Sequence, residues 1–234
     1  MGQMRTPDDF NAILRDWSER FQMQRGCYDG MSFSDCMELV RRIGTMICPG
    51  FVLDGENTGV FENLVRWVNG DPSAQCLTPD GHIARANLLK GIYLAGPTGT
   101  GKTICLNVLN IYAKTIGITY RVAGVVKPLG WGSQRADAIC EKFAQNGDLH
   151  SFKAEEILCI QDLCSEAPET LYMGNRRNVM QTVLESRGDA TNKITLVTSN
   201  KSIGKLGEFY GERVQSRAYE MFNYYVLKGA DRRK

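Results

Sequence analysis

The residues best suited to chemistry in this sequence lie at 96–103, GPTGTGKT. Glycines at this spacing let backbone N–H groups converge on phosphate oxygens, a lysine reaches the β- and γ-phosphates, and a threonine hydroxyl helps to hold Mg²⁺. An apolar run precedes this stretch and an amphipathic run follows it, an order that adds a helix N-terminus to a phosphate site. We call residues 96–103 the P-loop and predict nucleotide contacts at Gly96, Pro97, Thr98, Gly99, Thr100, Gly101, Lys102 and Thr103.

An acidic residue follows a second apolar run. Residues 157–160, ILCI, are followed by Gln161 and Asp162, and Glu166 comes a turn later as a second acid that could assist. A P-loop enzyme needs an acid at the tip of a neighbouring strand, to hold Mg²⁺ through water or to polarise the attacking water. We therefore predict that Asp162 is catalytic and that Asp162 and Thr103 are associated with Mg²⁺ through the nucleotide and water. The alternative is that Asp162 only caps the following turn.

Two further polar groups could complete such a site. The run TLVTSN ends in Asn200, whose amide could orient water or touch the γ-phosphate. Arg213 and Arg217 are four residues apart, so they share one helix face, and an arginine supplied to a neighbouring subunit can stabilise the transferred charge. Ordinary surface arginines would have the same spacing. We predict Asn200, Arg217 and Arg213 as catalytic candidates.

The elements that must position these residues alternate from residue 91 onward. Short apolar runs are separated by amphipathic stretches, which predicts an α/β fold with a parallel sheet covered by helices on both faces. Before residue 71, apolar residues recur at helical spacing in three stretches, at 9–21, 32–46 and 59–72. The expected organisation is a small helical, partner-docking region at 1–70, a connector at 71–90 and a nucleotide-binding core at 91–234. The five expected strands lie within residues 91–96, 118–126, 156–163, 193–200 and 223–229.

Composition excludes several other classes of protein. The chain has 234 residues, 23% of them charged, and a net charge of only +2, so charge alone does not indicate nucleic-acid binding. The 8 cysteines form no Cys-x-x-Cys pair and the 2 histidines stand apart from them, so we expect reduced thiols and no zinc site. No apolar run of about 18 residues and no secretory signal are present. A cytoplasmic protein without membrane contact is expected.

Taken together, the motifs resemble the DnaC/IstB group of AAA+ ATPases from about residue 51 to residue 234. The resemblance rests on GPTGTGKT, ILCIQDLCSE, NVMQTVLESR, TLVTSNKSIGKLGEFYGERVQSR and KGADRR, in that order. It implies that the Asn200 strand lies between the P-loop strand and the Asp162 strand, and that no full helical lid follows the core. By the same resemblance, Asn200 is similar to sensor 1, Arg217 to the arginine finger with Arg213 as the alternative, and Arg233 to the nucleotide-binding sensor 2.

The function that this resemblance implies is helicase loading in DNA replication. The expected cofactors are ATP and Mg²⁺, and the expected partners are a replicative helicase, single-stranded DNA and further copies of the chain. One departure matters: the family has two acids where this chain has Gln161 and Asp162, so we predict slow hydrolysis. The alternatives are an IstB-like transposition helper that acts with a transposase on duplex DNA, a nucleotide-binding scaffold with little turnover, and a P-loop small-molecule kinase, for which no arginine-rich lid insertion is present.

Overall fold

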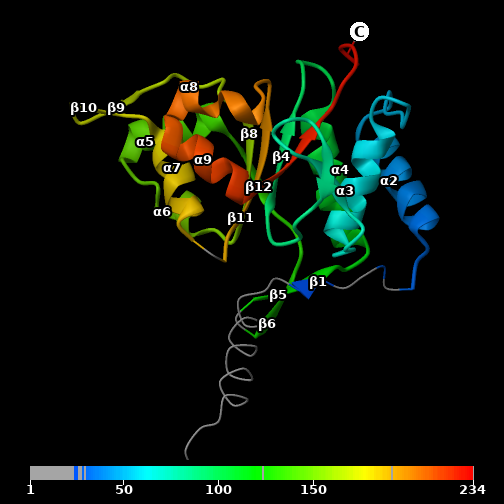
Figure 1. The fold of residues 1–234 in the computed structure, drawn as a ribbon. Helices are drawn as coiled ribbons and strands as arrows, with labels where there is room; N and C mark the ends of the chain where they lie inside the picture. Colours follow the sequence, from blue (N-terminus) through cyan, green and yellow to red (C-terminus); the bar gives the residue numbers. More distant parts are fainter. Residues whose placement is uncertain (1–23, 26–27, 29, 123, 191, 234) are drawn as a thin grey trace, which may run out of the picture.

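A seven-stranded sheet forms the centre of the molecule, in a computed structural model that describes residues 24–25, 28, 30–122, 124–190 and 192–233 (Figure 1). The strand order is β3-β2-β12-β4-β11-β8-β7. Five neighbouring strands are parallel, and β2 and β3 extend one edge as an antiparallel hairpin. The parallel strands are β12 (Phe222–Val226), β4 (Gly91–Ala95), β11 (Ile194–Ser199), β8 (Ile157–Leu163) and β7 (Gly132–Arg135).

Helices cover both faces of this sheet, which confirms the predicted three-layer α/β architecture (Figure 1). Every residue of β4 and β11 is buried, because alternate side chains enter two separate cores. Ile92 and Leu94 pack with one group of helices, α2 (Phe33–Ile47), α3 (Thr58–Val68) and α4 (Lys102–Thr115). Tyr93 and Ala95 pack with the other, α5 (Ala136–Asn146), α6 (His150–Ala154), α7 (Val179–Gly188), α8 (Leu206–Tyr210) and α9 (Glu212–Met221).

The strand order brings the predicted site residues to one edge. Strand β11 lies between β4 and β8, as the resemblance implied, and pairs in parallel with both. Because the carboxyl ends of parallel strands meet at one edge, the P-loop after β4, Asp162 in β8 and Asn200 after β11 are neighbours there.

The two described helices before the sheet agree with their predicted stretches. Helix α2 begins with a capping box in which Ser32 and Asp35 satisfy each other's backbone N–H groups. A Cβ at Gly44 of α2 would lie 2.2 Å from the Phe51 ring, so only glycine allows the segment after α2 to fold back onto it. Phe51 in turn contacts Phe61 of α3 edge-on. The predicted helix at 9–21 lies outside the described residues.

Several elements differ from the sequence-based expectation. The apolar stretch at 118–126 does not join the main sheet: it forms the hairpin β5 (Thr119–Val122) and β6 (Val125–Pro128), which pairs with β1 (Gln24–Arg25). The fifth parallel strand is instead the polar segment β7. The expected connector at 71–90 contains β2 (Gln75–Leu77) and β3 (Ile83–Arg85). A further hairpin, β9 (Thr170–Tyr172) and β10 (Asn175–Arg177), lies between β8 and α7.

The stretch after β11 is not one helix. It is a 3₁₀ turn (Ile203–Lys205) followed by α8 and α9, which are separated at Gly211, where φ is +83°. Residues 227–233, the described part of the chain after β12, contain no helix. Within the described ranges, no helix is both long and apolar enough to cross a membrane.

Candidate nucleotide-binding site

The P-loop connects β4 to α4 and depends on its glycines. Gly101 is the N-cap of α4 with φ +89°, in the left-handed region that favours glycine. A Cβ at Gly96 would lie 2.3 Å from the Leu227 carbonyl oxygen, and a Cβ at Gly99 would lie 2.0 Å from the Asp231 carboxylate. The chain after β12 therefore packs directly against the loop.

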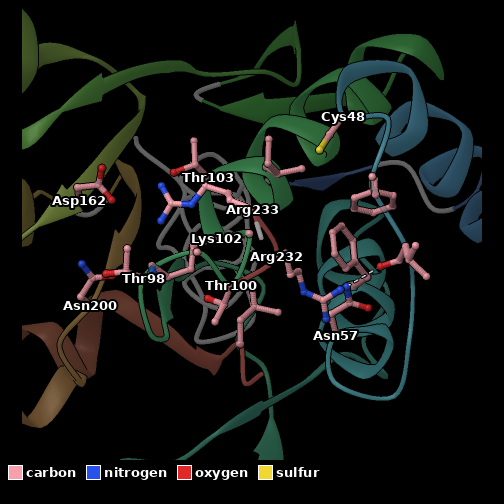
Figure 2. A pocket seen from close by; sticks show the side chains of 18 of the residues that line it. Cys48, Asn57, Thr98, Thr100, Lys102, Thr103, Asp162, Asn200, Arg232 and Arg233 are labelled. Atoms are coloured by element: carbon pink, nitrogen blue, oxygen red, sulfur yellow. Dashed lines mark hydrogen bonds between the residues drawn. The ribbon is translucent and has the colours of Figure 1, made fainter. Parts of the chain in front are cut away.

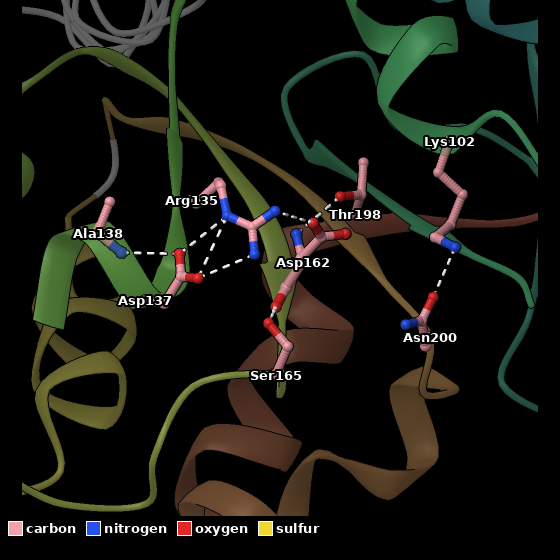
Figure 3. A network of polar contacts seen from close by, with 8 residues as sticks. All are labelled: Lys102, Arg135, Asp137, Ala138, Asp162, Ser165, Thr198 and Asn200. Atoms are coloured by element: carbon pink, nitrogen blue, oxygen red, sulfur yellow. Dashed lines mark hydrogen bonds and ion pairs between the residues drawn. The ribbon is translucent and has the colours of Figure 1, made fainter. Parts of the chain in front are cut away.

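Lys102 links the P-loop to the end of β11. The side chain is buried, and its Nζ donates to the carbonyls of Gly96 and Pro97, both at 2.8 Å, and to Asn200 Oδ1 at 2.7 Å (Figure 3). Burial lowers the pKa of Lys102, the nearby Asp162 carboxylate opposes this shift, and Arg233 adds to it. The three Lys102 hydrogen bonds are to uncharged oxygens, so an incoming phosphate would find this ammonium without a carboxylate bound to it.

Asp162 lies at the carboxyl end of β8 in an unusual backbone conformation. Its φ is +55°, the pairing of β8 with β11 shifts register beside it, and its N–H donates to Thr198 Oγ1 at 2.9 Å. A positive φ in a residue other than glycine is uncommon and is a recurrent feature of functional sites. The bulge leaves the carboxylate of Asp162 facing the P-loop cavity.

An arginine that the sequence analysis did not identify binds this carboxylate. Arg135 ends β7, and its Nη1 lies 3.2 Å from Asp162 Oδ2 (Figure 3). Its Nε and Nη2 also bond to Asp137, at 3.0 and 2.8 Å. Gln161 lies beside Arg135 in the strand register. The proposed helper acid, Glu166, instead accepts a hydrogen bond from the Tyr210 hydroxyl.

These groups surround a cavity of about 410 Å³, a size suited to a nucleotide. Its polar end is formed by P-loop residues together with Asp162, Asn200, Arg135 and Arg233. Arg232 lies toward the other end, beside Asn57 (Figure 2). Its other end is largely apolar and is formed by side chains from before α3, from α3, from α4 and from after β12, namely Cys48, Phe51, Val52, Phe61, Ile104 and Leu227.

The arginines after β12 differ in their contacts. Arg233, a predicted site residue, lines the cavity and pairs with Asp231 at 3.2 Å. Arg232, which the sequence analysis did not identify, also lines the cavity and forms two contacts with Asp54, at 2.8 and 2.9 Å. The Arg232 guanidinium lowers the pKa of Asp54. The Arg232 N–H donates to the Gly99 carbonyl, which fixes this end of the chain beside the P-loop.

Arg213 and Arg217 are not brought to this cavity. Both lie on α9 and face Asp189, with nitrogen–oxygen distances of 3.8 Å for Arg213 and 2.5 Å for Arg217. Asp189 is the C-cap of α7. Because α7 runs back from the carboxyl edge of the sheet to its amino edge, Asp189 lies at the amino edge, away from the cavity. The Arg213 side chain is 63% exposed and that of Arg217 28% exposed, so Arg213 is the more accessible to a neighbouring molecule.

The oxygen ligands at the cavity do not fit a magnesium ion anchored by protein carboxylates. Thr103 supplies a hydroxyl, and Asp162 is the one acid among the described residues that line the cavity. Its carboxylate is already ion-paired with Arg135, and position 161 carries an amide. Mg²⁺ prefers charged oxygen ligands in near-octahedral geometry. Within the described ranges, no group of three His, Cys, Asp or Glu side chains could hold a metal ion.

No family model and no curated protein matches this sequence. Solved structures do match the fold. A proposed primosome component from Streptococcus pyogenes serotype M3 has a TM-score of 0.52 at 19% identity, over 77% of this chain and 84% of that one. The DnaC helicase loader has a TM-score of 0.51 at 17% identity, over 76% of this chain and 93% of that one. The chain therefore shares the fold of these two structures.

Proposed function

We propose that this chain binds ATP and acts in DNA replication as a DnaC-like helicase loader. The observation that supports it best is the convergence of three strand ends on one cavity. Lys102 contacts Asn200 at 2.7 Å, and both line the cavity together with Asp162. This is the set of groups that a P-loop ATPase uses to hold a triphosphate and to polarise water. Arg233, at the same cavity, is suited to a phosphate contact.

Hydrolysis of ATP to ADP and phosphate is expected to be slow. We expect Asp162 to orient water, but Arg135 already occupies one of its carboxylate oxygens. Position 161 carries glutamine, so the second acid of the two-acid pattern is missing. Loss of one such electrostatic contact costs about 3 kcal/mol in a transition state, or roughly a hundredfold in rate. Slow turnover suits a switch in which ATP state controls assembly. If the chain does not hydrolyse ATP at all, it would act as a nucleotide-binding scaffold.

The proposed partners follow from the likeness to the DnaC helicase loader. We expect a replicative helicase to bind, with residues 1–70 as the docking region, and single-stranded DNA to contact the core at residues 91–234. The proposed site of action is the cytoplasm. An IstB-like role with a transposase on duplex DNA is the alternative, and copurification with a helicase or ATP-dependent assembly on duplex DNA would separate the two.

Self-association through the ATP site is the proposal that a single experiment tests best. Arg217 is the proposed residue that reaches a neighbouring subunit's nucleotide, with Arg213 as the alternative, and either must leave Asp189 to do so. Light scattering coupled to size exclusion should show a larger species with ATP and single-stranded DNA than without them. Arg217→Ala, or Arg213→Ala, should bind ATP but stay monomeric.

The matched control for this experiment is Arg176→Ala, a change on the exposed hairpin strand β10. It should assemble as the wild type does. A wild-type protein that binds ATP and remains monomeric with DNA would contradict the assembly proposal, and so would assembly that survives loss of both Arg213 and Arg217.

A further inference from the structure

The charged side chains that line the cavity are predominantly basic. Lys102, Arg135, Arg232 and Arg233 face it, and Asp162 is the single acid among the described lining residues. Each of the three arginines is ion-paired with an aspartate outside the lining, Arg135 with Asp137, Arg232 with Asp54 and Arg233 with Asp231. Lys102 is bound only to uncharged oxygens. An ATP molecule carries close to four negative charges, and ordinarily a bound Mg²⁺ neutralises part of them. Here Lys102 and the arginines are the groups that can donate to the phosphate oxygens.

Arg135 is the residue that this inference depends on. It lies in register with Gln161, on the strand next to the position where the second acid is missing. Asp137 holds one edge of the guanidinium through Nε at 3.0 Å and Nη2 at 2.8 Å. Nη1 is thereby directed toward Asp162, at the cavity wall (Figure 3). The side chain is 55% exposed, so an arriving anion can reach it.

We propose that Arg135 provides the charge neutralisation for which related sites use a carboxylate-anchored Mg²⁺, so that this site binds ATP without Mg²⁺. The inference rests on the proposed ATP binding and deepens it. A guanidinium has several N–H donors in a planar fork, so Arg135 can donate to a γ-phosphate oxygen while Asp137 keeps it in place. Asp162 then shares Nη1 with the phosphate.

The charge balance of the site supports this assignment. Glutamine at position 161 takes the place of the second acid, and Arg135 lies beside it. Both make the phosphate end of this cavity more positive than a site with two acids. Such a change weakens the attraction for a divalent cation and strengthens that for a polyanion, because both depend on the same local potential.

Isothermal titration calorimetry with ATP tests the inference in two buffers, one with EDTA and one with excess MgCl₂. The Kd of the wild-type protein should differ by less than about threefold between them. Binding that is more than about tenfold weaker in EDTA, a loss of about 1.4 kcal/mol, would overturn the Arg135 proposal and leave ATP binding intact. No binding in either buffer would overturn the proposed function itself.

Variants identify the residue responsible. Arg135→Gln should raise the Kd in EDTA by about tenfold or more, which is the loss of one charge-assisted hydrogen bond. Arg176→Gln, an exposed change away from the cavity, should leave the Kd unchanged. The double variant Arg135→Gln with Gln161→Asp should bind ATP well only with MgCl₂. An unchanged Kd for Arg135→Gln in EDTA, in a protein with wild-type circular dichroism, would contradict the proposal.

Discussion

At the scale of single residues, Gly99 and Asp231 make the tightest approach in the site. A Cβ at Gly99 would lie 2.0 Å from the Asp231 carboxylate, and Arg232 donates its N–H to the Gly99 carbonyl at 3.0 Å. Because Gly99 has no side chain, the segment after β12 can pack directly against the P-loop. Arg232 and Arg233, which follow Asp231 in the chain, line the cavity.

Gly99→Ala should therefore weaken ATP binding by at least about tenfold, because the new methyl group displaces Asp231 and with it Arg233. Gly117→Ala is the matched control: Gly117 also has a positive φ, +66°, but its Cβ position has nothing within 4 Å. Both changes should cost about 1 kcal/mol in the free energy of unfolding, from the left-handed backbone. Equal ATP affinity in the two variants, measured by calorimetry, would show that the contact is not needed.

Asp162→Asn should separate binding from hydrolysis. The change keeps the size of the side chain but removes the charge that is expected to polarise water, so the rate of phosphate release should fall by at least about tenfold. ATP should bind as tightly as before or more tightly, because a negative charge near the phosphates is lost. The measurement is a phosphate-release assay beside a calorimetric titration. A wild-type hydrolysis rate that Asp162→Asn leaves unchanged would remove Asp162 from the catalytic residues.

Sequence motifs identified some site residues and not others, for a physical reason. Lys102 and Asn200 each follow a long apolar run, which marks the end of a buried strand. Arg135 ends a four-residue strand, GSQR, that has no apolar pattern, and only its position before an amphipathic helix could have indicated it. Arg232 lines the cavity while it is hydrogen-bonded to Asp54. This partner is 178 residues away in the sequence, so residue spacing cannot predict the contact.

At the scale of elements, Glu156 connects the three-stranded sheet of β1, β5 and β6 to the seven-stranded sheet. It precedes β8 and bonds to Lys127 of β6 at 2.5 Å and to the Tyr120 hydroxyl of β5 at 2.6 Å. Lys127, and then Tyr120, hold the pKa of Glu156 below its usual value of 4.5. The lowered pKa means that this contact stabilises the fold fully above about pH 4.5 and loses that effect as pH falls through the folded-state pKa.

Glu156→Gln should consequently lower the free energy of unfolding at neutral pH by up to about 1 kcal/mol, since the pair is partly exposed and screened. The difference from wild type should shrink as pH falls below the usual glutamate pKa. Urea unfolding at neutral and acidic pH measures this, with the exposed change Glu141→Gln on α5 as control. A difference that stays constant across this pH range would mean that the ionised form of Glu156 does not support the junction.

The elements that the sequence predicted correctly are those with strong apolar patterns. Strands β4, β8 and β11 are almost entirely buried, and each contains apolar residues that pack into the two cores. The run at 118–126 has a similar composition but forms a hairpin, because Gly124, with φ +78°, allows a tight turn within it. Short strands near the edge of the sheet, such as β2 and β3, carry mixed residues and left no comparable pattern.

At the scale of the whole molecule, the cavity is closed by segments from both ends of the described chain. Phe51 and Asp54 approach from before α3, Arg232 and Arg233 from after β12, and the P-loop lies between them. ATP bound there would contact all three segments and should stabilise them together, because a ligand that binds only the folded state raises the free energy of unfolding. The proposed ATP binding would in this way be coupled to the packing of α2 and α3.

The convergence of three strand ends on one triphosphate is tested most directly by calorimetric titration of ATP into the wild-type and Lys102→Ala proteins. One ATP should bind each wild-type chain with a saturable heat, and Lys102→Ala should lose this binding while it keeps a wild-type circular dichroism spectrum. Absence of binding to the wild type, or an equal Kd for Lys102→Ala, would contradict the assignment of this cavity to ATP.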